Sequence, residues 1–281
     1  MKESPRIEIF QNINRFPVIA LLETLPPGVL LCFVAALGLV FGSFVTLASA
    51  RIPQGDSIVH TRSRCPSCLH VLGFRDLLPL FSWLLQQGRC RYCKVKIHFR
   101  YPLIELIQMV LFLSCYFVAG ISFEFIVLAL LSVMLLILIV IDFEHKIIPD
   151  GLQIAMAIVG VVYHVMHSGI DIALVIGPLS GFASAMALRL LFSWWKEQEA
   201  LGLGDVKFLA VAGLFLTPEL IIPFLLMSGV IGIATAMVWQ KVSGEKEFPF
   251  GPALAASLFL CVLLPEQYNE AYRQLISWLA E

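Results

Sequence analysis

Four cysteines are arranged in two pairs that could bind one metal ion. Two residues separate Cys65 from Cys68 and Cys90 from Cys93, and residues 69–89 lie between the pairs. Each pair fits a tight turn that directs both thiolates at one ion, and four thiolates form a closed tetrahedral zinc site. Such a site is structural and implies no reaction by itself. A redox-active cysteine pair is the alternative use of these residues.

Two aspartates lie at the ends of apolar segments, where an ionisable side chain is costly. Asp142 directly follows one apolar run, and Asp205 precedes another in Gly202-Leu203-Gly204-Asp205. Two carboxylates at one depth could share a proton, so that one stays ionised as a base while the other is protonated. Such a pair could activate water against an amide and protonate the leaving nitrogen.

The glycines before the second aspartate suit this chemistry. Gly202 and Gly204 would let an extended substrate backbone come close to Asp205. The competing interpretation is that these acidic residues cap helices, because Asp in a first turn stabilises the helix dipole. We favour capping for Asp150 and leave both roles open for Asp205 taken alone.

The elements that position these residues are membrane helices. Hydrophobic residues make up 59% of the 281 residues and charged residues 14%, against about 25% charged in a soluble domain. A spanning helix needs about 20 mainly apolar residues. The candidate segments are roughly 28–50, 102–118, 125–141, 152–166, 172–194, 206–216, 220–239 and 251–264. The sequence therefore predicts an all-α polytopic membrane bundle of about eight transmembrane helices, and its net charge of -1 indicates no nucleic-acid partner.

Lysine and arginine are concentrated on one side of this bundle. Of the 19 such residues, all but Lys2, Arg6, Arg15 and Arg273 fall in segments 51–101, 142–150, 189–207 and 241–249. Positively charged loops stay in the cytoplasm. Residues 51–101 are thus predicted to form a small cytoplasmic zinc-knuckle domain inserted between the first and second spans, with both termini periplasmic. The same topology puts Asp142 and Asp205 on the cytoplasmic face.

A series of motifs along nearly the whole chain resembles the type IV prepilin peptidase family. The motifs are Gly42-Ser43-Phe44 with Arg51-Ile52-Pro53, Cys65-Pro66-Ser67-Cys68, Pro79-Leu80-Phe81-Ser82-Trp83, Gly88-Arg89-Cys90-Arg91-Tyr92-Cys93, Arg100-Tyr101-Pro102-Leu103-Ile104-Glu105, Asp142 with Ile148-Pro149-Asp150, Gly202-x-Gly204-Asp205-x-Lys207, and Phe250-Gly251-Pro252. Each motif alone is weak, but their common order is specific.

The resemblance implies an aspartic protease of the bacterial inner membrane, with Asp142 and Asp205 as its catalytic pair. Its substrates would be prepilins of type IV pili or pseudopilins of type II secretion, with a basic leader in the cytoplasm and an apolar helix in the bilayer. Cleavage would fall at that boundary, between Gly and usually Phe. The family commonly also methylates the new N-terminal amine with S-adenosylmethionine, an activity associated with the cysteine domain.

The resulting division of the chain has four parts. Residues 1–25 are expected to be an interfacial segment, 26–50 the first transmembrane helix, 51–101 the cysteine and zinc domain, and 102–281 the membrane-embedded protease bundle.

Two alternatives and one question stay open. The family usually has Asp-Asn before an Ile/Val-Pro step, whereas here Asp76 precedes Leu77-Leu78-Pro79, so a peptidase without methyltransferase activity is the first alternative. A zinc-regulated membrane transporter is the second, although transporters usually carry ionisable sites near the midplane. The sequence leaves open whether the protein forms a homo-oligomer.

Overall fold

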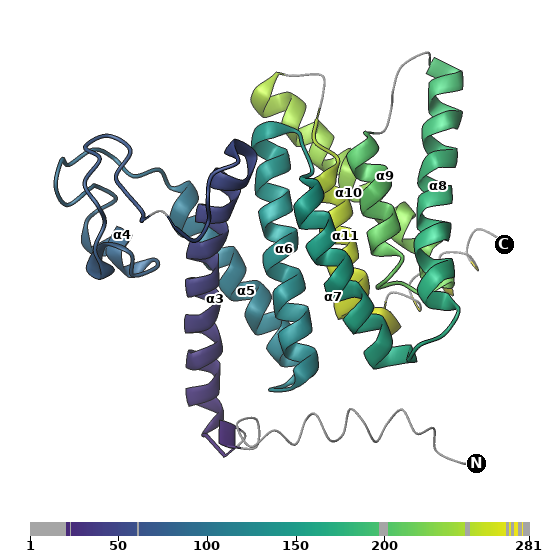
Figure 1. Ribbon diagram of the computed structural model, residues 1–281, viewed down its shortest axis with the longest axis horizontal. Helices are drawn as coiled ribbons and strands as arrows, with labels where there is room; N and C mark the ends of the chain where they lie inside the picture. The colour runs from purple at the N-terminus through teal and green to yellow at the C-terminus, as the bar shows by residue number, and fades with distance from the viewer. Residues whose placement is uncertain are drawn as a thin grey trace. The chain divides into compact units, whose positions relative to one another are not determined.

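The computed structural model describes residues 21–22, 24–60, 62–196, 202–244, 248–267, 270, 273–274 and 277. Across this part of the chain the secondary structure is helical, with two isolated β-bridges and no β-strand (Figure 1). The all-α fold is therefore confirmed. The interfacial segment predicted for residues 1–25 lies almost entirely outside the described residues.

Each of the eight predicted segments contains a helix. These helices are α3 (Pro27–Arg51), α5 (Arg100–Ala119), α6 (Phe123–His145), α7 (Asp150–Ser168), α8 (Ala173–Lys196), α9 (Leu203–Ala212), α10 (Pro218–Ser243) and α11 (Gly251–Leu263). Among the described residues, six helices are long and apolar enough to cross a membrane, namely all of these except α9 and α11. The protein is thus a multi-pass membrane protein whose two remaining bundle helices, of 10 and 13 residues, are short.

Glycine and proline set several of the helix ends. α5, α7 and α10 are followed by Gly120, Gly169 and Gly244, each with a positive φ that favours glycine. α3 and α10 begin at Pro27 and Pro218, where the missing N–H costs no intrahelical hydrogen bond. Hydropathy alone does not mark these boundaries, but the turn residues do.

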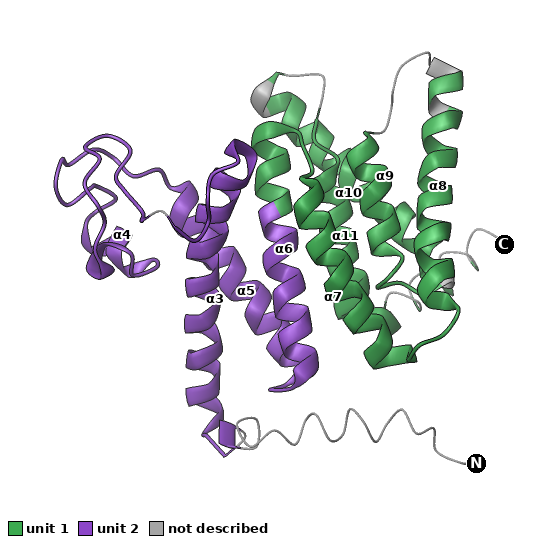
Figure 2. Ribbon diagram, viewed as in Figure 1, with its two compact units in different colours: residues 1–6, 138–281 green, residues 7–137 purple. Residues whose placement is uncertain are grey.

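The described residues form two compact units, those up to Ile137 in one and those from Leu138 onward in the other (Figure 2). In the first unit α3 packs along α5. A Cβ on Gly38 would lie 2.6 Å from the Met109 Cα, and one on Gly42 would lie 2.5 Å from the Glu105 Cα. The spacing of four residues between the two glycines lets the helix backbones approach closely, as is common between membrane helices.

The second unit encloses its two short helices. α9 packs against α7 and α8, and α11 packs against α10. A Cβ on either Gly177 or Gly213 would overlap the carbonyl of the other, so α8 and the end of α9 meet backbone to backbone. Of the 13 residues of α11, 11 are buried. Protein therefore surrounds α11, where a short helix is tolerated, whereas in α9 only Val206, Phe208, Leu209 and Ala212 are buried.

The division of the chain into four parts was based on the expected role of each segment, whereas the two units are defined by how compactly the chain packs. The four-part division stays a prediction.

Candidate active site

Asp142 lies in the last turn of α6 and is 5% exposed. Its Oδ2 accepts a hydrogen bond of 2.9 Å from the backbone N–H of Gly251, the first residue of α11. The N-terminus of a helix favours a negative charge, because its N–H groups have no intrahelical partner. A Cβ on Gly251 would lie 2.6 Å from the same oxygen. Only glycine at this position lets the carboxylate rest on the helix end.

Asp205 lies in the first turn of α9 and is partly buried. Its Oδ2 accepts a hydrogen bond of 3.2 Å from the N–H of Gly202. Asp205 therefore caps its own helix, as the competing interpretation predicted. Burial also raises the pKa of the Asp205 carboxyl to about 6. A carboxyl that titrates near neutral pH suits proton transfer, so capping and catalysis are compatible at this residue.

Ile148 links the surroundings of the two aspartates. A Cβ on Gly204, beside Asp205, would lie 3.3 Å from the Ile148 Cβ, and one on Gly251, beside Asp142, would lie 3.3 Å from the Ile148 Cδ1. One side chain thus packs against both helix N-termini that hold the carboxylates. The structure brings together the two residues that the sequence singled out.

The four cysteines also come together. Their sulfur atoms all lie within 4.8 Å of one another, and the Cys65 and Cys93 sulfurs are 3.8 Å apart. Zn–S bonds of about 2.3 Å in a tetrahedron put the sulfurs about 3.8 Å apart, whereas a disulfide needs about 2.05 Å. The cysteines are free thiols. They fit a four-sulfur metal site.

The two cysteine turns share one backbone conformation. The N–H of Leu69 donates to the carbonyl of Cys65 at 2.9 Å, and the N–H of Lys94 donates to that of Cys90 at 3.0 Å. Leu69 and Lys94 have φ values of 58° and 62°. The left-handed conformation of a non-glycine residue carries a cost, which metal binding by the folded turn would offset.

Comparisons with known proteins agree with this geometry. Residues 36–119 match the bacterial peptidase A24 N-terminal domain, and residues 129–237 match the type IV leader peptidase family. This chain belongs to the type IV leader peptidase family. No solved structure matches it.

Relatives named prepilin leader peptidase/N-methyltransferase occur in several bacteria. The Myxococcus xanthus protein is 35% identical over 76% of this chain and 64% of its own length. The Pectobacterium carotovorum protein is 32% identical over 78% of this chain and 88% of its own length. The Bacillus subtilis protein is 30% identical over 84% of this chain and 94% of its own length. The similarity thus extends through both compact units.

Asp150 has a partner that the sequence did not indicate. In this leader peptidase family member, the Lys207 Nζ lies 2.7 Å from the Asp150 Oδ1. The pair joins the first turn of α7 to α9, two residues beyond Asp205. Both side chains are more than half exposed, so the pair adds only about 0–1 kcal/mol of stability. It is a surface contact between α7 and α9 close to Asp205.

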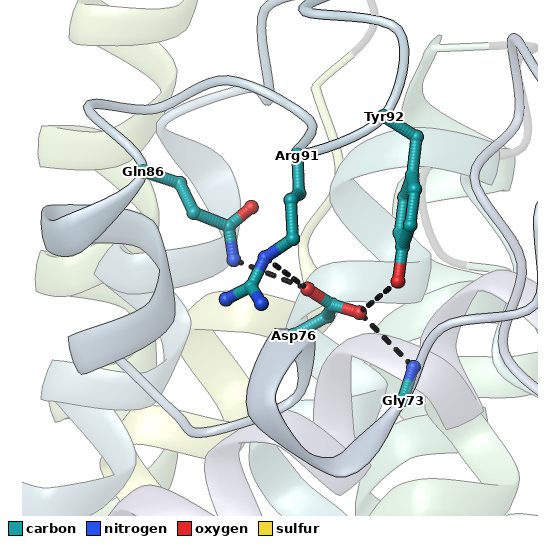
Figure 3. A network of polar contacts seen from close by, with 5 residues as sticks. All are labelled: Gly73, Asp76, Gln86, Arg91 and Tyr92. Carbon is teal, nitrogen blue, oxygen red and sulfur yellow. Dashed lines mark hydrogen bonds and ion pairs between the residues drawn. The ribbon is translucent and has the colours of Figure 1, made fainter.

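Asp76 organises the second cysteine turn (Figure 3). Its Oδ1 lies 3.1 Å from the Arg91 Nε, and its Oδ2 accepts hydrogen bonds from the Tyr92 hydroxyl at 3.2 Å and the Gly73 N–H at 3.1 Å. Arg91 and Tyr92 lie between the two cysteines of that turn. The Asp76 side chain is only 6% exposed. The departure from the usual family motif after Asp76 therefore leaves the carboxylate and its contacts in place.

Three motifs of the first unit meet at Glu105, which is 7% exposed in α5. The Glu105 Oε2 accepts a hydrogen bond of 2.7 Å from the N–H of Leu80. Ser43 of α3 is a second polar neighbour of Glu105. Leu80 has a φ of 60° and precedes α4 (Phe81–Leu85). Sequence reasoning missed this junction, because its members are separated by up to 62 positions and share no local pattern.

Proposed function

We propose that this protein removes the basic leader from prepilins and pseudopilins, with Asp142 and Asp205 as the catalytic pair. The observation that carries the proposal is the convergence of these two carboxylates, each held by a glycine N–H and both beside Ile148. Relatives of this protein are named prepilin leader peptidase/N-methyltransferase. One from Escherichia coli is named as a leader peptide-processing enzyme of type 4 prepilin-like proteins. Neither the site nor these relatives favour the transporter alternative.

The chemistry requires one ionised and one protonated carboxyl. The ionised aspartate takes a proton from water, and the water oxygen attacks the carbonyl carbon of the peptide bond. The protonated aspartate gives its proton to the leaving nitrogen, so that the C–N bond breaks to an acid and an amine. The glycine N–H groups each hold one oxygen of a carboxyl. We assign the second oxygen of each to water and proton transfer.

The site is assigned to the cytoplasmic face of the inner membrane. Asp142 lies in the last turn of α6 and Asp205 in the first turn of α9, and the positively charged segments next to both predict that side. Residues 51–101 would then be cytoplasmic and both termini periplasmic. A substrate with a charged leader and an apolar helix changes from water to lipid at this depth, so its boundary would reach the aspartates.

We assign one structural zinc ion to Cys65, Cys68, Cys90 and Cys93. A bound zinc ion would cross-link the two cysteine turns. A small domain with little apolar core needs such a cross-link to be stable. We further propose that the protein methylates the new N-terminal amine, with S-adenosylmethionine as the methyl donor. The names of the relatives support this activity. A peptidase that does not methylate is the alternative.

The test is co-expression of a prepilin with the wild-type protein, Asp142→Asn or Asp205→Asn. Both variants should accumulate in the membrane yet leave the precursor uncut, because an amide neither takes nor gives the required proton. Mass spectrometry of the wild-type product then separates the two versions of the proposal, since methylation adds one methyl group to the mature N-terminus. Full processing by either variant would refute the role of that aspartate.

A further inference from the structure

An apolar groove of about 450 Å³ lies between α8, α9 and α10. Leu188 of α8 and Leu209 of α9 line one side, and Gly229, Gly232 and Met237 of α10 line another, with Phe250 at the start of α11. All of these residues belong to the second compact unit. The volume lies within the range of about 300–1,000 Å³ that is typical of ligand sites.

The groove follows α10 along one face. Its lining residues run from Leu225 to Gln240, which corresponds to about 22 Å of helix at 1.5 Å per residue. Ser228 is the only hydroxyl among the lining residues, and it donates within its own helix to the carbonyl of Phe224. The small residues along this face would let a second helix approach the α10 backbone. The surface therefore suits an apolar helix better than a polar ligand.

The groove passes close to the two aspartates, near the middle of its run along α10. The Phe250 ring packs over Gly232, where a Cβ would lie 2.7 Å from the Phe250 Cε2. Phe250 directly precedes Gly251, whose N–H holds Asp142. On the other side, Leu209 lies one helical turn after Asp205. A segment bound in the groove would thus pass beside the two carboxyls.

We propose that this groove binds the apolar transmembrane helix of the prepilin, with the first residues of that helix at the aspartates. The inference rests on the proposed function and adds the binding surface for the substrate. A leader peptidase must place a peptide bond between its carboxyls while the following helix stays in lipid. A groove that passes the carboxyls and continues along α10 as an apolar surface meets both requirements.

Gly229 allows a direct test, because a Cβ there would meet nothing within 4 Å. Gly229→Trp should therefore fill the groove without disturbing the helix, and Val230→Trp is the matched control on an exposed neighbour outside the lining. With full-length prepilin we expect Gly229→Trp to raise KM about tenfold, the order of one helix–helix contact in lipid. Val230→Trp should keep the wild-type KM.

A second substrate that lacks the apolar helix completes a double-mutant cycle. If the prepilin helix binds in the groove, removing that helix from the substrate and filling the groove with Gly229→Trp should each lower kcat/KM. Gly229→Trp should then cause no further loss of kcat/KM on the substrate that lacks the helix. Fully additive effects would overturn the proposal. Failure of the wild-type protein to cut either substrate would instead count against the proposed peptidase function.

A photo-crosslinking amino acid gives an independent readout in the full-length protein. In membranes containing the Asp205→Asn protein, a crosslinker at Met237 should capture the uncut prepilin, whereas one at Val238 should not. These neighbours are 58% and 62% exposed, and only Met237 lines the groove. Capture of lipid alone at Met237, or equal capture of prepilin at both positions, would refute the proposed binding surface.

Discussion

Gly251→Ala is the sharpest test of the way that the protein holds Asp142. The added Cβ would lie 2.6 Å from the Asp142 Oδ2 and 3.3 Å from the Ile148 Cδ1. The first distance is too short for any real contact, so the carboxylate must move away from the N-terminus of α11. That movement breaks the hydrogen bond of 2.9 Å from the Gly251 N–H.

The size of the effect follows from that hydrogen bond. A hydrogen bond to a charged group contributes about 1.5–3 kcal/mol. If the whole loss is felt in the transition state, the rate falls about 10- to 150-fold. A displacement of about 1 Å of a catalytic group has a similar cost of about 100-fold. We therefore expect kcat for prepilin cleavage to fall about 100-fold, with a much smaller change in KM.

The assay is cleavage of a purified prepilin by detergent-solubilised enzyme, with Gly151→Ala as the matched control. Gly151 lies in α7, where a Cβ would meet nothing within 4 Å. The control should keep wild-type activity, since alanine is the better helix former. Wild-type kcat in Gly251→Ala would refute the catalytic use of the Asp142 geometry. An equal loss in both variants would show a general effect of glycine replacement instead.

Three further predictions concern other parts of the molecule. Cys65→Ser should lower the metal content measured on the purified protein and expose residues 51–101 to protease; unchanged zinc stoichiometry would contradict the four-sulfur site. Asp76→Asn should weaken the contact with Arg91 by about 1.5–3 kcal/mol, seen as zinc loss at lower chelator concentration than in the wild type. Asp171 lies outside the spans, and its hydrogen bond with His164 lowers its pKa below 3.8. The stability from this contact should be present above pH 3.8 and be lost as pH falls through the lowered value, a change in melting temperature that Asp171→Asn should abolish.

The apolar segments predicted the helices well because hydropathy is a local property. The sixth segment shows the limit. The sequence predicted residues 206–216, whereas α9 is Leu203–Ala212. Its start is set by Gly202 and Asp205, which form the cap, and hydropathy does not register a cap. The two Cys-x2-Cys motifs could also be recognised from the sequence, since each turn needs only residues that are close together in the chain.

Contacts between residues that are distant in the sequence could not be predicted in the same way. Nothing near Asp142 in the sequence indicates that the N–H of Gly251, 109 positions away, holds it. The role of Ile148 is visible only when Gly204 and Gly251 are seen on either side of it. The motif Phe250-Gly251-Pro252 did mark the region, but a motif does not say which atom a glycine makes room for.

One physical requirement explains a glycine beside each of the two aspartates. Each aspartate rests an oxygen on the N–H of a glycine at a helix start, Gly251 for Asp142 and Gly202 for Asp205. A Cβ on these glycines would lie 2.6 Å and 3.2 Å from the carboxylate oxygens, so other residues would push the carboxyls away. The exposed N–H groups at such a helix start are tolerated in a membrane protein only where protein lines the site. The short helices α9 and α11, whose first N–H groups are free to bind an anion, are therefore suited to hold the two carboxyls.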